Sequence, residues 1–308
     1  MTATSTTPLD VDWLGHPRSI AACLIESDGQ AALIDPGPSC ALPALRKKLL
    51  ARGLAVTDLD AILLTHIHLD HAGATGSLVR ENPRLPVYVH ALGAPHMADP
   101  VKLLESAGRL YGDKMGRLYG EFLPVSRENL RILEGGETLS IGARQLDVLH
   151  TPGHARHHVC YFDSAEGVAF VGDTAGIGIE GDNFVLPATP PPDVDLDLWD
   201  SSLAAISSRR PARLFLTHFA FSNHPAAHLH EFRERLHRWA AQVRELLRAS
   251  GDEPAAFASF VGSVRAELER QVPGPEFAHY LFNGGLDLSW LGLARYWRKH
   301  ELAAPPTH

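Results

Sequence analysis

The sequence predicts an α+β fold with a strand-rich body and an all-helical end. Short apolar runs of strand length alternate with helical patterns as far as about residue 224. From Pro225 onward, long amphipathic patterns follow one another and no strand signal remains. We therefore expect two parts: a body over residues 1–224 that holds the sheets, and a helical extension over residues 225–308 that packs on it.

The first elements of the body have clear local signals. The apolar runs "SIAACLIES" and "QAALIDPG" are joined by Asp28-Gly29, which is typical of a β-hairpin. "ALPALRKKLLARG" has helical spacing and ends at Gly53, a residue type common just after helices. "LDAILLT" is short and continuously apolar, as a strand buried on both faces would be. "AGATGSLVREN" then predicts a helix, and "PVYVHA" the next strand.

The rest of the chain follows the same logic. Residues 95–124 interrupt the alternation and predict a helical insertion broken around Gly112. Strands resume in "RILEGGETLSIG", "RQLDVLHTPGH" and "HHVCYFDSAEGVAFVGD", and residues 179–199 predict a proline-rich loop. "WDSSLAAISSRR" predicts a helix and "ARLFLTHF" the last strand. The extension predicts three helices, the last broken at Asn283-Gly284-Gly285.

Composition and charge exclude several classes of protein. The formal net charge of the 308 residues is -8, and no run of Lys and Arg offers a surface for nucleic acid or for an anionic membrane. No apolar run approaches the roughly 20 residues of a membrane span, and the N-terminus does not resemble a secretory signal. Three cysteines without a CxxC spacing predict free thiols. We therefore expect a cytoplasmic protein.

Side chains that bind metals gather at predicted strand ends. "LTHIHLDHAG" places His66 and His68 two positions apart, so an extended backbone puts both on one face. Asp70 and His71 follow where the chain should turn into a helix. Three further strand ends each carry one side chain of a ligand type: His154, Asp173 and His218. Because α/β sheets build sites along the edge where strands end, the sequence predicts a metal site there.

These motifs resemble those of a known family. "THIHLDHAG" resembles the HxHxDH signature of the metallo-β-lactamase superfamily, and "TPGH", "FVGD" and "LTH" resemble its later ligand motifs in the expected order. The resemblance covers about residues 20–219. It implies a four-layer αββα sandwich, in which two β-sheets lie face to face with helices outside and the metal site lies along one edge.

The resemblance also implies two divalent metal ions. The first would be held by His66, His68 and His154 and the second by Asp70, His71 and His218, with Asp173 between them. Nitrogen and oxygen donors without a thiolate suit zinc, although iron or manganese would also fit. Asp35 in "LIDPG" matches a family position near the site, where it either orients a ligand or shapes the turn before Pro36.

Two divalent cations predict a hydrolase. Even one zinc ion lowers the pKa of bound water from about 15.7 to about 7, so a hydroxide bridging two ions would be the nucleophile. We expect it to attack a small ester-type bond in a phosphodiester, phosphotriester, lactone or thioester. Asp70 and Asp173 are the candidate catalytic residues, and Asp70 could also pass a proton to the leaving group.

Substrate contacts are expected from the insertion. An insertion that follows a strand end beside the metals could form a lid with an apolar lining. Within it Tyr111 is the preferred contact and Met115 a second one, and His224 could reach the site from the loop after the last strand. The alternative is that these side chains form the core of a helical hairpin and, for His224, part of an ordinary loop.

The sequence does not decide between the branches of this family. Aspartate at position 173, where the best-known β-lactamases have cysteine, is similar to glyoxalase II, the lactonases and the phosphodiesterases. "TPGHARHHVCYF" resembles glyoxalase II except that His157 stands in place of a glycine. The alternative function is a mono-iron sulfur (persulfide) dioxygenase, and a nuclease or a non-catalytic binding module is disfavoured. Trp290, Tyr296 and Trp297 would pack the extension onto the body or form a homodimer contact.

Overall fold

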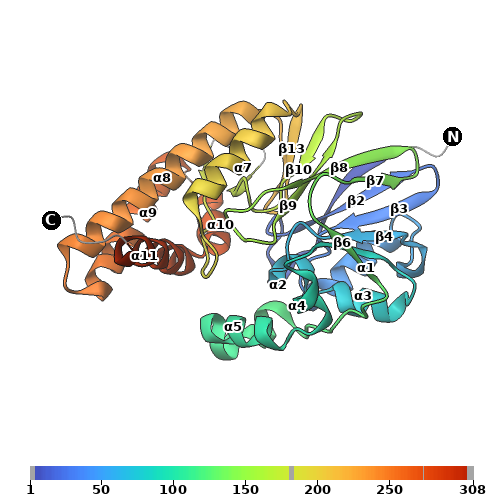
Figure 1. The fold of residues 1–308 in the computed structure, drawn as a ribbon, viewed down its shortest axis with the longest axis horizontal. Helices are drawn as coiled ribbons and strands as arrows, with labels where there is room; N and C mark the ends of the chain where they lie inside the picture. Colours follow the sequence, from blue (N-terminus) through green and yellow to red (C-terminus); the bar gives the residue numbers. More distant parts are fainter. Residues whose placement is uncertain (1–3, 180–183, 273, 304–308) are drawn as a thin grey trace.

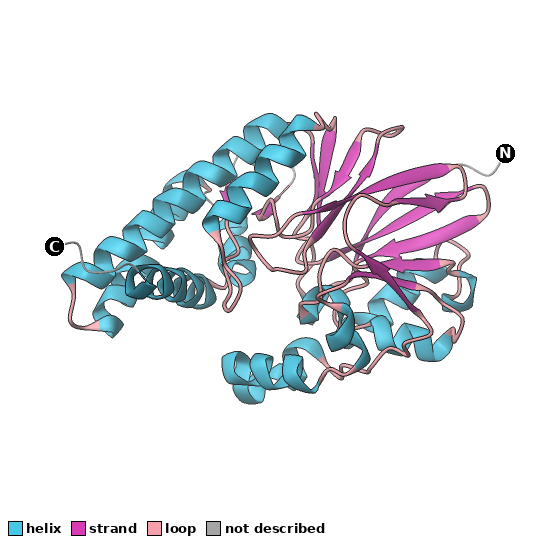
Figure 2. Ribbon diagram, viewed as in Figure 1, coloured by secondary structure: helices cyan, strands magenta, loops and turns pink. Residues whose placement is uncertain are grey.

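Two six-stranded β-sheets lie face to face with helices on both outer sides (Figure 2). The structure is a computed structural model that describes residues 4–179, 184–272 and 274–303. The strand order is β1-β2-β3-β4-β5-β6 in the first sheet and β14-β13-β10-β9-β8-β7 in the second. The predicted four-layer αββα sandwich is therefore confirmed (Figure 1).

The first sheet brings several carboxyl strand ends to one edge. Its strands are β1 (Ser5–Asp10), β2 (Ala21–Ser27), β3 (Gln30–Ile34), β4 (Ala61–Leu63), β5 (Val87–His90) and β6 (Leu130–Leu133). Strands β2 and β3 form the predicted hairpin, in which Asp28 and Gly29 both have the positive φ that a type I′ turn requires. Strands β3 to β6 are parallel, so the loops after β3 and β4 leave the sheet on the same side.

Strand β1 is an element that the sequence did not predict. It pairs with β2 and forms the edge of the sheet. Pro8 is tolerated there because an edge strand can lack a backbone donor. Leu9 is the only buried residue of β1, so the strand has no alternation of apolar and polar residues that could reveal it.

The second sheet completes the sandwich. Its strands are β7 (Thr138–Ile141), β8 (Arg144–His150), β9 (Val159–Asp163), β10 (Val168–Phe170), β13 (Arg213–Leu216) and β14 (Ala220–Ser222). Strands β10 and β13 pair in parallel and the other neighbours pair antiparallel. Tyr161 and Phe215 belong to the core between the sheets, whereas Phe162 and Leu214 face the outer helices. The central strands β9 and β10 are thus buried on both faces, whereas the edge strand β7 is partly exposed.

The outer layers differ in size. Helices α1 (Leu42–Leu50) and α3 (Thr75–Glu81) cover the first sheet, and α7 (Leu196–Ser208) and α8 (Pro225–Ala249) cover the second. The helices α9 (Glu253–Gln271), α10 (Pro275–Gly284) and α11 (Leu286–Ala303) follow α8. Trp290 and Tyr296 are buried in the core shared by the extension and the second sheet, and the Trp297 indole donates to the Ala240 carbonyl. These aromatic side chains therefore pack within the chain.

Shorter elements lie around the site. Helix α2 (Leu69–Ala72) follows β4, and the insertion contains α4 (Ala94–Ala98), α5 (Val101–Tyr111) and α6 (Met115–Tyr119). Single turns of 3₁₀-helix lie at Trp13–Gly15, Ser39–Ala41, Val56–Asp58 and Gly112–Lys114. The predicted loop at 179–199 lies partly outside the described residues, and a two-stranded sheet of β11 (Ile177–Gly178) and β12 (Val185–Leu186) involves it. No described helix is long and apolar enough to cross a membrane.

Candidate metal centre

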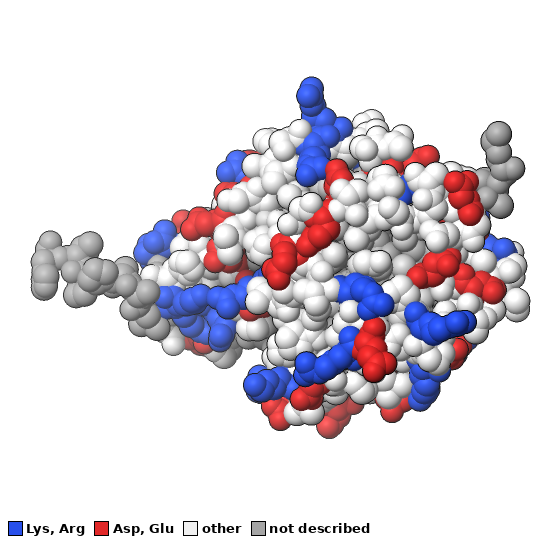
Figure 3. All heavy atoms as spheres, turned by 45° about the vertical axis from the view of Figure 1, so that its right-hand side comes forward, with Lys and Arg blue, Asp and Glu red and all other residues white. Residues whose placement is uncertain are grey.

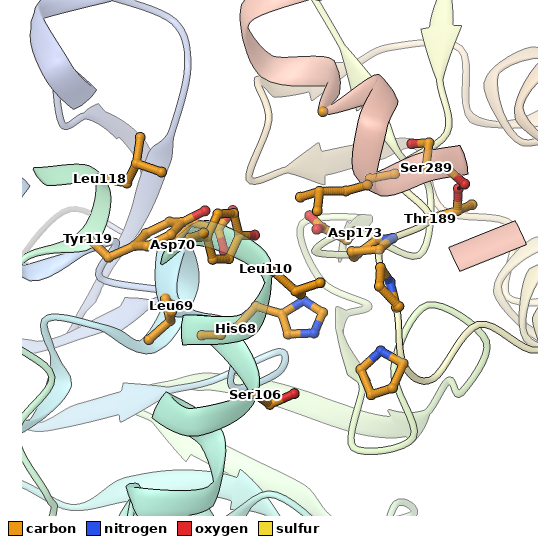
Figure 4. Close-up of a pocket in the computed structure, with 18 of the residues that line it drawn as sticks. His68, Leu69, Asp70, Ser106, Leu110, Leu118, Tyr119, Asp173, Thr189 and Ser289 are labelled. Atoms are coloured by element: carbon orange, nitrogen blue, oxygen red, sulfur yellow. Dashed lines mark hydrogen bonds between the residues drawn. The ribbon is translucent and has the colours of Figure 1, made fainter. Parts of the chain in front are cut away.

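The predicted ligands meet at one edge of the sandwich; His68, Asp70 and Asp173 are labelled among the residues in Figure 4. The chain leaves β4 at Leu63, bends at Thr65, is extended at His68 and begins α2 at Leu69. His66 and His68 therefore come from the short segment between β4 and α2, and Asp70 and His71 from the first helical turn. The other members follow β8, β10 and β13: His154, Asp173 and His218.

Four side chains form a first cluster. The Nδ1 atom of His68 lies 3.0 Å from Nε2 of His66 and 3.0 Å from Nε2 of His154. Oδ2 of Asp173 lies 3.4 Å from Nε2 of His154 and 3.9 Å from Nε2 of His66. Ligand-type atoms of all four lie within 4.8 Å of one another, so they could hold one metal ion.

A second cluster adjoins the first across Asp173. Nε2 of His218 lies 3.4 Å from Oδ2 of Asp70, and Nε2 of His71 lies 3.9 Å from the same oxygen. Oδ1 of Asp173 lies 3.2 Å from Nε2 of His71 and 3.7 Å from Nε2 of His218. One oxygen of Asp173 thus faces each cluster, as a bridging carboxylate would.

Two buried atoms at this junction are suited to bind cations. Nε2 of His71 and Oδ1 of Asp173 lie 3.2 Å apart, and neither has a hydrogen-bond partner elsewhere within the described part of the chain. Buried polar atoms are nearly always satisfied, so such a pair in one place needs an explanation. The donor sets consist of imidazole nitrogens and carboxylate oxygens, which suit Zn²⁺, Fe²⁺ or Mn²⁺. The residues therefore fit divalent metal ions.

The outward nitrogens of the histidines are held in place. His154 Nδ1 donates to the Ala188 carbonyl (2.9 Å) and His218 Nδ1 donates to the Ser19 carbonyl (2.7 Å). His71 Nδ1 donates to Oδ2 of Asp35 at 2.8 Å. Such contacts select the tautomer in which Nε2 is a free acceptor, and they orient the ring. Each of these three Nε2 atoms faces a cluster.

Asp35 accepts hydrogen bonds that connect several loops around the site. Its Oδ1 accepts from the Thr65 backbone N–H (2.8 Å), and its Oδ2 accepts from the hydroxyls of Thr65 (2.6 Å) and Thr217 (3.1 Å) as well as from His71. Its φ is 49°, a left-handed conformation that aspartate tolerates better than most residues. Asp35 also lies close enough to His66 and His71 to form a ligand group with them, but its Oδ2 already accepts three hydrogen bonds and its Oδ1 one. Asp35 therefore orients His71 and ties together the loops after β3, β4 and β13.

Burial and nearby charges separate the histidines into two groups. Burial lowers the pKa of His66 well below its usual range and that of His68 to about 3, and neighbouring imidazoles add to the effect. Burial also lowers the pKa of His154. Burial likewise opposes protonation of His71 and His218, but nearby carboxylates outweigh it and raise both pKa values. The first cluster therefore presents neutral imidazoles, which is the form that binds metals.

The carboxylates are ionised. Burial opposes their ionisation, but the His71 and His218 imidazoles outweigh it, hold the pKa of Asp173 well below its usual range and lower that of Asp70 to about 2. Buried negative charge needs a positive partner. Metal ions would supply that charge.

Two further histidines come from the motif after β8. His158 is fully buried, and its Nδ1 lies 2.9 Å from the Thr151 hydroxyl while its Nε2 accepts from the Asp173 backbone N–H. It supports the segment that carries Asp173. His157 stacks at 6.1 Å on the His66 ring and borders the cavity described next.

A cavity of about 760 Å³ opens above the clusters. It lies between α5 with α6 on one side and the α10–α11 junction on the other (Figure 4). Tyr111, which the sequence indicates as the preferred substrate contact, lines this cavity. Met115 packs instead against the apolar core outside the first sheet, and the exposed His224 precedes α8; neither is among the described residues that border the cavity.

Several cavity residues were missed by sequence reasoning. Trp13 from the N-terminal loop lines the cavity, as do Phe282 to Gly285 and Asp287 to Ser289 from the extension. The Trp13 ring lies 5.3 Å from that of Phe282, and its indole donates to the Leu118 carbonyl at 2.7 Å. Trp13 therefore bridges the insertion and the extension. In the sequence, only the predicted helix break at Gly284-Gly285 could have indicated that this part of the extension lines the cavity.

An αββα sandwich with two adjoining His/Asp clusters at the strand ends defines a class of metal-site proteins. Residues 16–218 match the family model of the metallo-beta-lactamase superfamily. The chain belongs to this superfamily, as the resemblance in its motifs predicted.

Individual relatives match over part of their length. A protein named "Probable hydroxyacylglutathione hydrolase" from Schizosaccharomyces pombe is 33% identical over 54% of this chain and 54% of its own length. A metallo-beta-lactamase fold-containing protein from Sulfurisphaera tokodaii is 30% identical over 52% of this chain and 60% of its own length. The matches thus span little more than half the length of these curated relatives.

Solved structures are similar along nearly the whole chain. A metallo-beta-lactamase family protein from Thermus thermophilus has a TM-score of 0.71 and 21% identity, with 98% of this chain and 95% of that chain covered. An archaeal superfamily member from Sulfolobus tokodaii has a TM-score of 0.66 and 23% identity, with 95% and 98% covered. At these identities the likeness shows the fold, including the helical extension.

Proposed function

We propose that this chain is a binuclear metal-dependent hydrolase that cleaves a small ester-type bond. The observation that carries the proposal is Asp173, whose two oxygens face two separate clusters of ligand-type atoms. A single-metal enzyme would need only the first cluster. The second cluster of Asp70, His71 and His218 is complete and adjoins the same carboxylate.

The proposed function assigns a role to each part of the site. Two divalent ions, most suitably zinc, would activate water near neutral pH and polarise the oxygen of the scissile bond. Asp173 and the histidines would hold the ions in place. The side chain of Asp70 is 25% exposed, more than that of Asp173 or His218, and it borders the cavity. It is therefore placed to take a proton from water and deliver it to the leaving group.

The surroundings support a small organic substrate. A cavity of about 760 Å³ is in the range of sites for small molecules. On the face drawn in Figure 3, Lys and Arg are interspersed with Asp and Glu, a pattern that gives little hold for nucleic acid. The names of several relatives favour a thioester. Tyr111, whose ring meets that of Tyr119 edge-on at 4.9 Å, is the proposed contact beside the reacting group.

Metal content is the first test. Protein purified without chelator or added metal should contain about two zinc ions, or a zinc-like mixture, per chain by elemental analysis. The loaded protein should then hydrolyse at least one of a thioester, a lactone and a phosphodiester. About one iron per chain, together with oxygen uptake on persulfides, would instead establish the sulfur dioxygenase alternative.

A further inference from the structure

The two sides of the cavity carry opposite charge. Lys102, Arg109 and Lys114 line it from α5 and the turn that follows, and we call this side the insertion wall. Asp193 and Asp287 line it from the loop before α7 and from the first turn of α11, and we call this side the tail wall. In Figure 4, Ser106 and Leu110 mark the insertion wall, and Thr189 and Ser289 lie across the cavity from them.

The cations of the insertion wall have no partners of their own. All three side chains are exposed, and none forms an ion pair or a hydrogen bond with another described residue. Glu105 lies three positions after Lys102 and four before Arg109, yet it pairs with neither. Some other arginines of the chain are neutralised: Arg18 by Glu276, Arg52 by Glu26 and Arg233 by Asp200. The insertion wall thus places three cations without an ion pair beside the cavity, in a protein of net charge -8.

The spacing aligns these cations along the cavity. Lys102 and Arg109 lie seven positions apart, which is two helical turns or roughly 10 Å on one face of α5. Lys114 follows the turn at Gly112 and also lines the cavity. The same side contributes apolar and aromatic lining as well: Leu103, Ala107, Leu110, Tyr111 and Leu118. A ligand that reaches from the clusters along this side would therefore meet apolar surface as well as positive charge.

We propose that the substrate carries an anionic group, a carboxylate or a phosphate, separated from the ester-type bond by an apolar spacer. Arg109 binds this group together with Lys102 and Lys114. The carboxylates of Asp193 and Asp287 repel it from the tail wall, so charge also sets the direction in which the substrate enters. This inference rests on the proposed hydrolase function and specifies its substrate class.

A matched set of substrates tests the charge preference. The metal-loaded protein would be assayed with N-acetylcysteamine thioesters of pentanoate, glutarate and 5-aminopentanoate, and with the corresponding phenyl esters. These acyl chains have the same number of carbons and end in a methyl, an anionic or a cationic group. We expect kcat/KM to be at least tenfold higher for the glutaryl compound than for the pentanoyl compound, and lowest for the amine. Added salt should reduce this preference because it screens exposed charges.

Charge reversal on the insertion wall tests the residues. Arg109→Glu should raise the KM of the glutaryl compound about tenfold or more, with kcat changed less than twofold, and should lower kcat/KM for the glutaryl compound at least tenfold more than for the pentanoyl compound. Arg117→Glu is the matched control, since Arg117 is an exposed cation of the same insertion but does not line the cavity. The binding of glutarate, which involves no turnover, can be measured by calorimetry. We expect it to be weaker in Arg109→Glu than in Arg117→Glu.

The possible outcomes distinguish failure of the anionic-substrate inference from failure of the proposed hydrolase function. Hydrolysis of all three acyl chains at similar kcat/KM, unchanged by Arg109→Glu, would overturn the anionic-substrate inference and leave the hydrolase function standing. Preference for the amine would overturn the inference too. Failure of the metal-loaded protein to hydrolyse any member of either series, or a phosphodiester or a lactone, would overturn the proposed function and the inference with it.

Discussion

The metal centre and the walls of the cavity above it are built in different ways. The candidate ligands follow four strand ends, most of them are buried, and the outward nitrogens of His71, His154 and His218 are held by Asp35 or by backbone carbonyls. The walls come from helices and a loop added to the sandwich, and their charged side chains are largely exposed. Rigid parts of the fold thus hold the reacting groups, and peripheral segments determine what reaches them.

This difference predicts two classes of variant. Changes at the metal centre should remove metal and activity together, because its side chains depend on one another through short contacts. Changes in the walls should alter KM and substrate preference while the metal content stays the same. The following substitutions range from the largest expected effect to the smallest.

Asp173→Ala should have the largest effect. It removes the carboxylate that faces both clusters, so we expect metal content to fall below one ion per chain and kcat to fall more than roughly 100-fold, beyond what outer partners of ligands cost. His68→Ala should behave similarly. Elemental analysis and steady-state kinetics on the same samples would measure both quantities. Full turnover by either variant would refute the ligand assignment.

Asp35→Asn should have an intermediate effect. The amide keeps the size of the side chain but cannot accept all of the bonds from His71, Thr65 and Thr217. We expect metal affinity or activity to fall roughly 10–100-fold, as for other partners of metal ligands. Competition with a chromogenic chelator would measure the affinity.

Thr217→Val is a milder change in the same set of hydrogen bonds. It removes only one of the hydroxyls that donate to Asp35, so its loss should be smaller than that of Asp35→Asn. Equal losses in the two variants would show that Asp35 acts through the packing of the loops rather than through His71.

Much of the fold, and the grouping of the candidate ligands at one edge, could be predicted because the signals are local. The candidate ligands come after apolar runs, where turn signals end the predicted strands. The antiparallel hairpin of β2 and β3 was visible in Asp28-Gly29. Strand β1 was not visible, because an edge strand with a single buried residue has no periodic pattern.

The cavity walls could not be predicted to the same extent. Trp13 and Phe282 lie far apart in the chain, and no local pattern announces their contact. Met115 and Tyr111 belong to the same insertion and both pack against the core outside the first sheet, but of the two only Tyr111 also lines the cavity. His224 follows the last ligand by six positions and lies outside the cavity. Position relative to a site depends on tertiary packing, which residue type and spacing alone do not specify.

Substitutions of Tyr111 should have the smallest effects, and these should be confined to substrate binding. It lines the cavity and contacts Tyr119, and burial raises the pKa of its phenol, so the hydroxyl stays protonated and can donate a hydrogen bond. Tyr111→Phe removes only that donor, worth about 0.5–1.5 kcal/mol, so KM should rise by roughly two- to tenfold with metal content unchanged. Tyr111→Ala also removes the ring and should alter the preference among acyl chains. A lower metal content in Tyr111→Ala would instead place Tyr111 in the scaffold of the metal centre, because a wall residue can be lost without loosening buried ligands.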